Sequence, residues 1–248
     1  MKRIIDKIRT GFEYILDLGM MSIFLLLFLV GLYAVYDVHQ VNTSAAIDEQ
    51  ITELAPSAES EEEDKVDFAE LKSINSEIQA WVRIDDTKID YPIVQAKNNT
   101  KYLTRNYRGE YATAGSVFLD YRNHGFNDDL SIIYAHRMSN QLMFGGIALF
   151  NDAKYFKEHP GGTLYTPDAT YDLEIMYFSV LNIDTADIYT NARRWNGHNA
   201  EIINYIKDNA RQSREVEISA DDKILLLSTC DKDSKHYRNV LLAKMIKR

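Results

Sequence analysis

Residues 223–246 read KILLLSTCDKDSKHYRNVLLAKMI, which is two apolar runs joined by a short polar segment. Each run has the length and residue types of a β-strand, and so short a connection predicts that the two strands pair in antiparallel fashion. This pairing would bring Cys230, at the end of the first run, and Arg238, at the start of the second, to one edge of the sheet. Residues at a strand end are held by a rigid element and still face the surface, so this edge is a candidate functional site.

Six further runs of β-type residues precede this pair and are separated by clusters of turn-forming residues. They lie at residues 81–84, 89–94, 116–120, 130–135, 162–166 and 171–183. Many short strands without regular strand and helix alternation predict a mostly β protein built as a closed barrel of about eight strands. Apolar residues at helical spacing predict peripheral helices at 67–80 and, ahead of the cysteine strand, at 199–211.

The chain has 248 residues and a formal net charge of −9, from 28 Lys and Arg against 37 Asp and Glu. This excess of acidic residues argues against a protein that binds nucleic acid through basic charge. The acidic residues concentrate in residues 37–66, which have few aromatic residues and the composition of a solvated linker. Residues 67–248 have the size of one globular domain and form the predicted folded domain.

Residues 18–36 form an uncharged apolar run of 19 residues, which is long enough to cross a bilayer as a helix. Basic residues cluster before the run and acidic residues follow it. The positive-inside rule therefore places residues 1–17 in the cytoplasm and residues 37–248 outside the membrane. A cleaved signal peptide is the alternative, but small residues are expected at its cleavage site, and Tyr33, Tyr36 and Asp37 lie there instead. The sequence therefore favours an uncleaved, single-pass anchor in the cell membrane.

Cys230 is the single cysteine of the chain, so it cannot form an internal disulfide in the oxidising space outside the membrane. A free thiol is largely protonated at neutral pH and needs a partner that accepts its proton. Among six histidines, His136 follows the apolar strand at 130–135 and thus stands at a strand end as Cys230 does, whereas His236 lies in the connecting loop. We therefore favour His136 over His236 as the acid and base, and Arg238 as a donor to an oxyanion.

These residues match a known family. The cysteine strand ends in Leu226–Cys230, Arg238 opens the next strand, and Tyr134–His136 supplies the strand-end histidine. With Gly115–Asp120 and other segments between about 75 and 248, the chain resembles the class B sortases, membrane-anchored cysteine transpeptidases of Gram-positive bacteria. Ala135 and Leu226 depart from residues common in that family, and both changes are conservative.

The resemblance implies a two-step acyl transfer. The thiolate of Cys230 would attack a carbonyl in a C-terminal sorting signal similar to Asn-Pro-x-Thr-x, His136 would protonate the leaving amine, and Arg238 would stabilise the oxyanion. An amine of the cell wall, or a pilin lysine in relatives that polymerise pilins, would then resolve the thioacyl enzyme. Ser228 and Thr229 would contact the peptide. The resemblance implies no cofactor, and the sequence has no cluster of metal-binding spacing, so no metal is predicted.

Two other functions remain open at this point. An extracytoplasmic cysteine hydrolase would share Cys230 and His136 but would release the acyl group to water. A non-enzymatic, membrane-tethered barrel that binds peptide would leave Cys230 as a buried apolar residue, which is a common fate of free cysteine. The position of the thiol at a strand end favours an enzyme over this third possibility.

Overall fold

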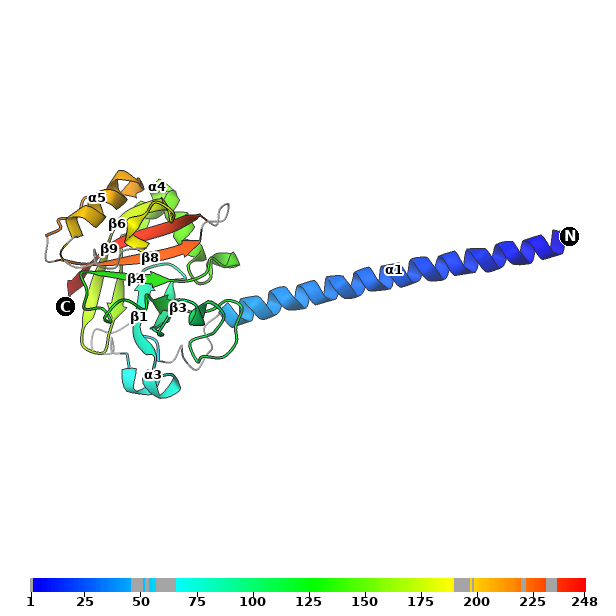
Figure 1. Cartoon of the computed structure of the whole chain (residues 1–248), viewed down its shortest axis with the longest axis horizontal. Helices are drawn as coiled ribbons and strands as arrows, with labels where there is room; N and C mark the ends of the chain where they lie inside the picture. Colours follow the sequence, from blue (N-terminus) through cyan, green and yellow to red (C-terminus); the bar gives the residue numbers. More distant parts are fainter. Residues whose placement is uncertain are drawn as a thin grey trace. The chain divides into compact units, whose positions relative to one another are not determined.

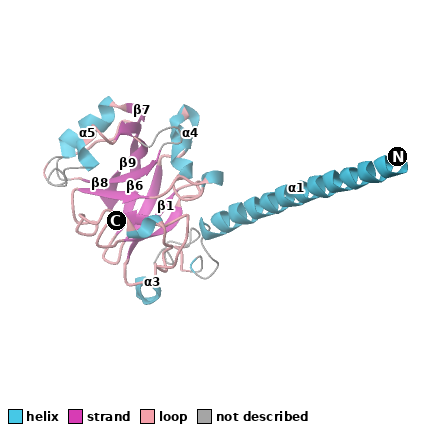
Figure 2. Cartoon of the chain, turned by 45° about the vertical axis from the view of Figure 1, so that its right-hand side comes forward, coloured by secondary structure: helices cyan, strands magenta, loops and turns pink. Residues whose placement is uncertain are grey.

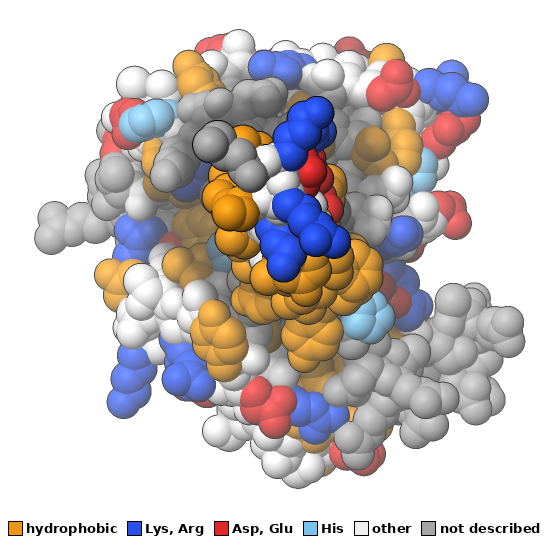
Figure 3. Space-filling view, turned by 90° about the vertical axis from the view of Figure 1, so that its right-hand side faces the viewer, with side chains coloured by type: hydrophobic (Ala, Val, Ile, Leu, Met, Phe, Trp, Pro, Cys, Tyr) orange, Lys and Arg blue, Asp and Glu red, His pale blue; other side chains and the backbone are white. Residues whose placement is uncertain are grey.

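The computed structural model describes residues 2–45, 51, 54–56, 66–189, 197, 199–219, 222–230 and 236–248. The chain divides into two compact units, Met1–Thr43 and Ser44–Arg248. The first unit consists of the helix α1 (Lys2–Ala45), which continues two residues past its boundary (Figure 1). Within the described part of the chain, Lys2–His39 is the one helical stretch long and apolar enough to cross a membrane. Figure 3 shows its apolar side chains surrounding the helix, with Lys and Arg side chains at the N-terminal end.

The second unit is a β-barrel. Its strands are β1 (Ile78–Ile84), β2 (Asp90–Val94), β3 (Val117–Leu119), β4 (Leu130–Tyr134), β5 (Gly161–Tyr165), β6 (Thr170–Asn182), β7 (Ala210–Ser213), β8 (Lys223–Cys230) and β9 (Tyr237–Lys247). The order in the sheet is β5-β1-β2-β3-β4-β8-β9-β6-β7, and an additional pairing of β5 with β6 closes eight strands into a barrel. The predicted closed barrel of about eight strands is therefore confirmed, with β7 added at the edge of β6.

Two neighbouring strand pairs are parallel, β2 with β3 and β4 with β8, and the other pairs are antiparallel. Alternate side chains of each strand point to opposite faces of the sheet. In β8, Leu225 and Leu227 belong to the large cluster inside the barrel, whereas Ile224 and Leu226 belong to a second cluster on the outer face. This double burial explains why the strand reads as a continuous apolar run rather than an alternating one.

Helices lie around the barrel rather than within it (Figure 2). They are α3 (Phe68–Ile74), α4 (Ala153–Glu158) and α5 (Asn199–Asp208), with 3-10 helices η1 (Lys101–Leu103), η2 (Ser139–Gln141), η3 (Gly145–Asn151) and η4 (Asp187–Tyr189). The helix α5 covers the outer-face cluster through Ile202, Ile203 and Ile206. Figures 1 and 2 place α3 at the opposite end of the barrel from α5.

Both predicted helices end earlier than their apolar spacing suggested. The chain turns extended at Asn75, and Ile78, expected on a helix, begins β1 because it pairs with Val94 of β2. After α5, the chain forms β7, which pairs with β6. In each case hydrogen bonds to a neighbouring strand outweigh a local helical preference, which is a weak bias of less than about 1 kcal/mol per residue.

Part of the acidic segment 37–66 packs on the barrel. Ile51 is fully buried in a third cluster with Leu71 and Trp81, and the Arg83 guanidinium donates to the Pro56 carbonyl at 2.5 Å. Residues 57–65, which hold most of the acidic run, lie outside the described residues. The described residues at 51 and 54–56 therefore contact the domain, whereas the sequence predicted a solvated linker.

Candidate active site

The residues singled out in the sequence lie on β8 and β9 or, in the case of His136, two residues past the end of the adjacent strand β4. In the β8–β9 pair, Cys230 is directly opposite Arg238, as the sequence predicts. In the β4–β8 pair, Tyr134 is opposite Ser228, and the Ala135 amide donates to the Ser228 carbonyl at 3.3 Å, so the parallel pairing continues past the end of β4. His136 is the next residue and lies two positions past the end of β4.

Extended two residues past the end of β4, this register would place position 136 in one row with positions 230 and 238, which are paired across β8 and β9. The side chain of Cys230 and residues 231–235 lie outside the described part of the structure. This row depends on the fold, because His136 and Cys230 are nearly a hundred positions apart in sequence. Their segments become neighbours only through the parallel pairing of β4 with β8.

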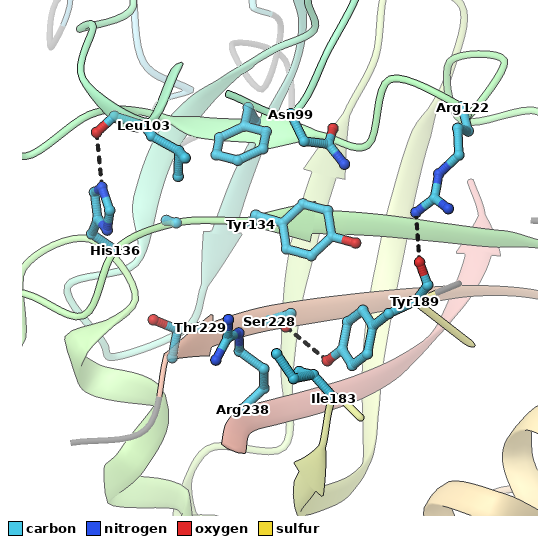
Figure 4. A pocket seen from close by; sticks show the side chains of 12 residues that line it. Asn99, Leu103, Arg122, Tyr134, His136, Ile183, Tyr189, Ser228, Thr229 and Arg238 are labelled. Atoms are coloured by element: carbon cyan, nitrogen blue, oxygen red, sulfur yellow. Dashed lines mark hydrogen bonds between the residues drawn. The ribbon is translucent and has the colours of Figure 1, made fainter. Parts of the chain in front are cut away.

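A cavity of about 300 Å³ lies at this end of the strands (Figure 4). Its wall includes four of the five predicted site residues, His136, Arg238, Ser228 and Thr229. The other lining residues are Asn99, Leu103, Phe118, Arg122, Tyr134, Ala135, Ile183 and Tyr189. The volume is at the lower end of that of ligand sites in proteins and suits a short peptide segment better than a large cofactor.

The imidazole of His136 is oriented by the main chain. Its Nε2 atom lies 2.8 Å from the Leu103 carbonyl oxygen, and because a carbonyl can only accept, Nε2 carries the hydrogen. Nδ1 is then the ring atom that can gain or lose a proton. Gly115, with φ of +65°, lies against this acceptor: a Cβ atom there would be 2.8 Å from the Leu103 oxygen.

The segment that follows His136 is also held tightly. The Phe144 amide donates to the His136 carbonyl at 3.1 Å, and the Met143 amide donates to the Tyr91 hydroxyl at 2.9 Å. Met143 and Gln141 have positive φ angles of 50° and 66°, which are uncommon for residues other than glycine. Strained backbone of this kind persists only where surrounding contacts enforce it, and here it adjoins the histidine.

The strand-end residues of β8 differ in their contacts. The Ser228 hydroxyl lies 2.8 Å from the hydroxyl of Tyr189. The Thr229 hydroxyl is buried and has no hydrogen-bond partner among the described residues. The Arg238 side chain is half-buried, donates from Nη1 to the Tyr237 carbonyl at 2.9 Å, and lies on the same side of the cavity as Thr229 (Figure 4). A guanidinium and a buried hydroxyl thus both reach the cavity wall.

One wall of the cavity is built around a buried carboxylate that the sequence analysis did not identify as part of the site. Asp120 is fully buried and accepts from the side chains of Arg122, Asn99 and Tyr134. Burial alone would raise the pKa of Asp120, but the hydrogen bonds from Arg122 and Asn99 outweigh it and hold that pKa below its usual value. Burial and the Asp120 charge raise the pKa of Tyr134, so its hydroxyl stays protonated and donates.

His236, the alternative acid and base, lies elsewhere. It is exposed, and its Nδ1 atom is 2.8 Å from a carboxylate oxygen of Asp184. It is absent from the residues that line the cavity. Ile183 and Tyr189, from the segment after β6, line the cavity, while residues 190–196 and 198 lie outside the described residues.

Comparison with known proteins agrees with this architecture. Sortase B of Listeria monocytogenes is 34% identical over 184 residues, which are 73% of this chain and 74% of the relative. Sortase B of Staphylococcus aureus is 27% identical over 186 residues, 73% of this chain and 75% of the relative. The crystal structure of a class B sortase from Streptococcus pyogenes involved in pilus biogenesis superposes with a TM-score of 0.67 at 32% identity and covers 73% of this chain and 98% of its own. No family model matches the sequence.

The barrel, closed by β5–β6 and carrying a cysteine at the end of β8, defines the sortase class of cysteine transpeptidases. The identity to the Listeria relative extends over most of both chains, so the family within this class can also be assigned. The chain belongs to the sortase B family. It is an enzyme of that family, a class B cysteine transpeptidase.

Proposed function

We propose that this enzyme is anchored in the cell membrane by residues 18–36 and joins surface proteins to an amine of the cell wall. The proposed domains are a cytoplasmic N-terminus (1–17), the anchor, an extracytoplasmic linker (37–66) and the catalytic domain (67–248). The apolar surface of α1 supports the anchor, because side chains such as Phe24, Leu27 and Phe28 are exposed and the helix is long enough for a bilayer to cover them.

Cys230 is the proposed nucleophile. Its thiolate attacks the carbonyl carbon of the scissile bond, and the bond to the leaving amine breaks as Nδ1 of His136 gives it a proton. An incoming amine then attacks the thioacyl carbon, loses a proton to His136, and releases Cys230. Arg238 binds the oxyanion that forms in both steps. The single observation that carries these roles is that His136 and Arg238 line one cavity at the end of β8, where Arg238 is paired with Cys230.

The peptide substrate is proposed to lie in the cavity, with Ser228 and Thr229 as contacts. Supporting observations come from relatives: one solved structure is a Staphylococcus aureus sortase B–substrate complex, and a sortase B has been solved in complex with triglycine. A sorting signal similar to Asn-Pro-x-Thr-x and an amine acceptor of peptidoglycan follow from that likeness. Polymerisation of pilins is a second candidate, favoured by the relationship to the Streptococcus pyogenes enzyme of pilus biogenesis.

Hydrolysis is the competing outcome for the same thioacyl intermediate, since water and an amine attack the same carbon. The half-buried cavity favours an amine that is bound over bulk water, because bound nucleophiles react as if at high local concentration. A strict hydrolase would yield the free acid whatever amine is added.

Mass spectrometry of the full chain in detergent, incubated with candidate sorting peptides, tests the proposal. We expect a mass increase on Cys230 equal to the acyl fragment, and transfer of that fragment to triglycine when the amine is added. The Cys230→Ala variant is expected to form no adduct, and His136→Ala to release no leaving peptide, while both retain a folded barrel. The absence of any adduct on the wild-type enzyme with all peptides, or hydrolysis that triglycine does not divert, would refute transpeptidation of sorting signals.

A further inference from the structure

Asp120 follows β3 and is the most heavily hydrogen-bonded carboxylate beside the cavity. Its side chain is fully buried and accepts from Nε and Nη2 of Arg122 at 2.9 and 2.8 Å and from the Arg122 amide at 2.9 Å. It also accepts from Nδ2 of Asn99 at 2.8 Å and from the Tyr134 hydroxyl at 3.0 Å. Five donors from three residues therefore converge on two oxygen atoms.

The residues that Asp120 holds are the cavity wall itself. Asn99, Arg122 and Tyr134 all line the cavity. Asn99 comes from the loop after β2, Arg122 from the turn after β3, and Tyr134 from β4 itself. The Asn99 side chain also accepts from the Tyr121 amide at 2.9 Å, so both of its polar atoms are used within the protein. These two hydrogen bonds fix the orientation of the Asn99 amide in the wall.

The network continues across the cavity through Arg122. Its Nη2 atom donates to the Tyr189 carbonyl at 3.0 Å, and the Tyr189 hydroxyl lies 2.8 Å from that of Ser228, two residues before Cys230 (Figure 4). Tyr189 also contacts the Tyr134 ring, with centroids 6.4 Å apart. A continuous set of contacts thus runs from Asp120 to the strand that carries the cysteine.

The hydrogen bonds to Asp120 involve more residues than an ion pair with Arg122 alone. A buried pair between residues 120 and 122 contributes little net stability, because desolvation offsets the charge attraction. Here the charge instead fixes the direction of three side chains and one carbonyl that surround a cavity, which is the arrangement expected of a support for a binding site.

We propose that Asp120 is a positioning residue for substrate binding: through Arg122 and Tyr134 it sets the shape of the cavity wall, and through Arg122 it fixes Tyr189 against Ser228. This role rests on the proposed function in that the cavity is taken to hold the peptide. Asp120 itself touches no reacting atom, so it acts on the affinity for the peptide and not on the chemical step.

The test is steady-state transpeptidation by the full chain with a sorting peptide and triglycine, comparing Asp120→Asn with wild type. Asparagine has the same shape but cannot accept with both side-chain atoms or balance the guanidinium. We expect KM for the peptide to rise by about tenfold or more, since hydrogen bonds to charged groups are lost. The kcat value should stay within about threefold, since a mutation that removes binding alone leaves kcat unchanged.

Asp128→Asn is the matched control. Asp128 is also a buried carboxylate on this turn, and it accepts from the Asn123 side chain at 2.8 Å and the His124 amide at 2.9 Å, neither of which lines the cavity. It should lose a comparable amount of stability with KM unchanged. An equal rise of KM in both variants, or no rise in Asp120→Asn, would overturn the proposal.

A second variant keeps the test decisive if Asp120→Asn does not fold. Arg122→Lys retains the positive charge beside Asp120, but one ammonium cannot replace the fork of donors that reaches Asp120 and Tyr189 together. We expect KM to rise by several-fold in Arg122→Lys alone, and an unchanged KM would overturn the proposal. Where Asp120→Asn does fold, the Asp120→Asn/Arg122→Lys double variant should resemble the worse single variant, as for residues that act as a unit. Multiplied single effects would mean independent roles and would overturn the proposal. Loss of the thioacyl adduct in wild type, by contrast, would refute the proposed function and not this role of Asp120.

Discussion

Gly115 is the position where a single added methyl group should most directly disturb the histidine. In Gly115→Ala, the new Cβ would lie 2.5 Å from the Tyr102 carbonyl oxygen and 2.8 Å from that of Leu103. Two penalties apply: a left-handed alanine, with φ of +65°, costs roughly 1–2 kcal/mol, and the overlap with backbone adds roughly 1–3 kcal/mol because backbone yields poorly. We expect a total loss of about 2–5 kcal/mol in the free energy of unfolding.

Gly109→Ala is the control that separates these two penalties. Gly109 has φ of +86° but no atom within 4 Å of the place where the added methyl group would lie, so only the left-handed penalty of about 1–2 kcal/mol applies. Guanidinium unfolding of both variants, followed by tryptophan fluorescence, measures the difference. At a temperature where both are folded, Gly115→Ala should also lose transpeptidation, since the displaced Leu103 carbonyl is the acceptor for His136. Equal loss of stability and activity in the two variants would show that the close approach at Gly115 is unimportant.

Four further substitutions and conditions probe the rest of the site. Arg238→Lys should lose most of its transpeptidation, because a single ammonium cannot reproduce the guanidinium fork, and wild-type rates would exclude the oxyanion role. Thr229→Val should leave the free energy of unfolding unchanged or higher, because the buried hydroxyl has no partner among the described residues. It should raise KM for the peptide, and an unchanged KM would exclude Thr229 as a contact. Tyr91→Phe leaves the Met143 amide without its acceptor, so it should lower the free energy of unfolding by about 1–3 kcal/mol and also lower kcat. Its control is Ser179→Ala, which removes a buried hydroxyl bonded to the Ile206 carbonyl and should lower stability alone. The pKa of Asp120 lies below its ordinary value of 3.8, so its contribution to stability is complete above that value and disappears as the pH falls through the lower folded pKa. Unfolding titrations of wild type and Asp120→Asn, run from neutral pH down to about pH 2, should show a weaker acid dependence in the variant, and parallel curves would contradict the assignment.

The sequence predicted the strands well because each buried strand carries its own signal. All eight predicted runs are strands, and the pairing of Cys230 with Arg238 followed from two apolar runs and a short connection. The missed elements are those where local preference and neighbours disagree. The helical spacing that reached Ile78 and the residues after Asp208 are overridden by ladder hydrogen bonds to β2 and β6.

Local sequence signals also explain which of the predicted site residues line the cavity. His136, Ser228, Thr229 and Arg238 stand next to strand ends, where a pattern in one segment reveals them, and they line the cavity. Asn99 and Arg122 belong to turns whose residue types indicate only a change of direction. Their position in the wall comes from Asp120, a contact over more than twenty residues for Asn99, which no local pattern encodes.

The amino-acid sequence alone therefore determined the candidate nucleophile and its strand, the arginine opposite it, an apolar N-terminal helix and the strands of a barrel. Hydrophobic periodicity and short connections carry this information, and both are local. Only the tertiary structure decided that β4 pairs in parallel with β8, which brings the segment with His136 to the same end of the sheet as the end of β8, and that a buried carboxylate holds the side chains of the cavity wall. These arrangements depend on closure of the barrel, because a parallel pairing and a buried charge are stable only when distant segments cover them.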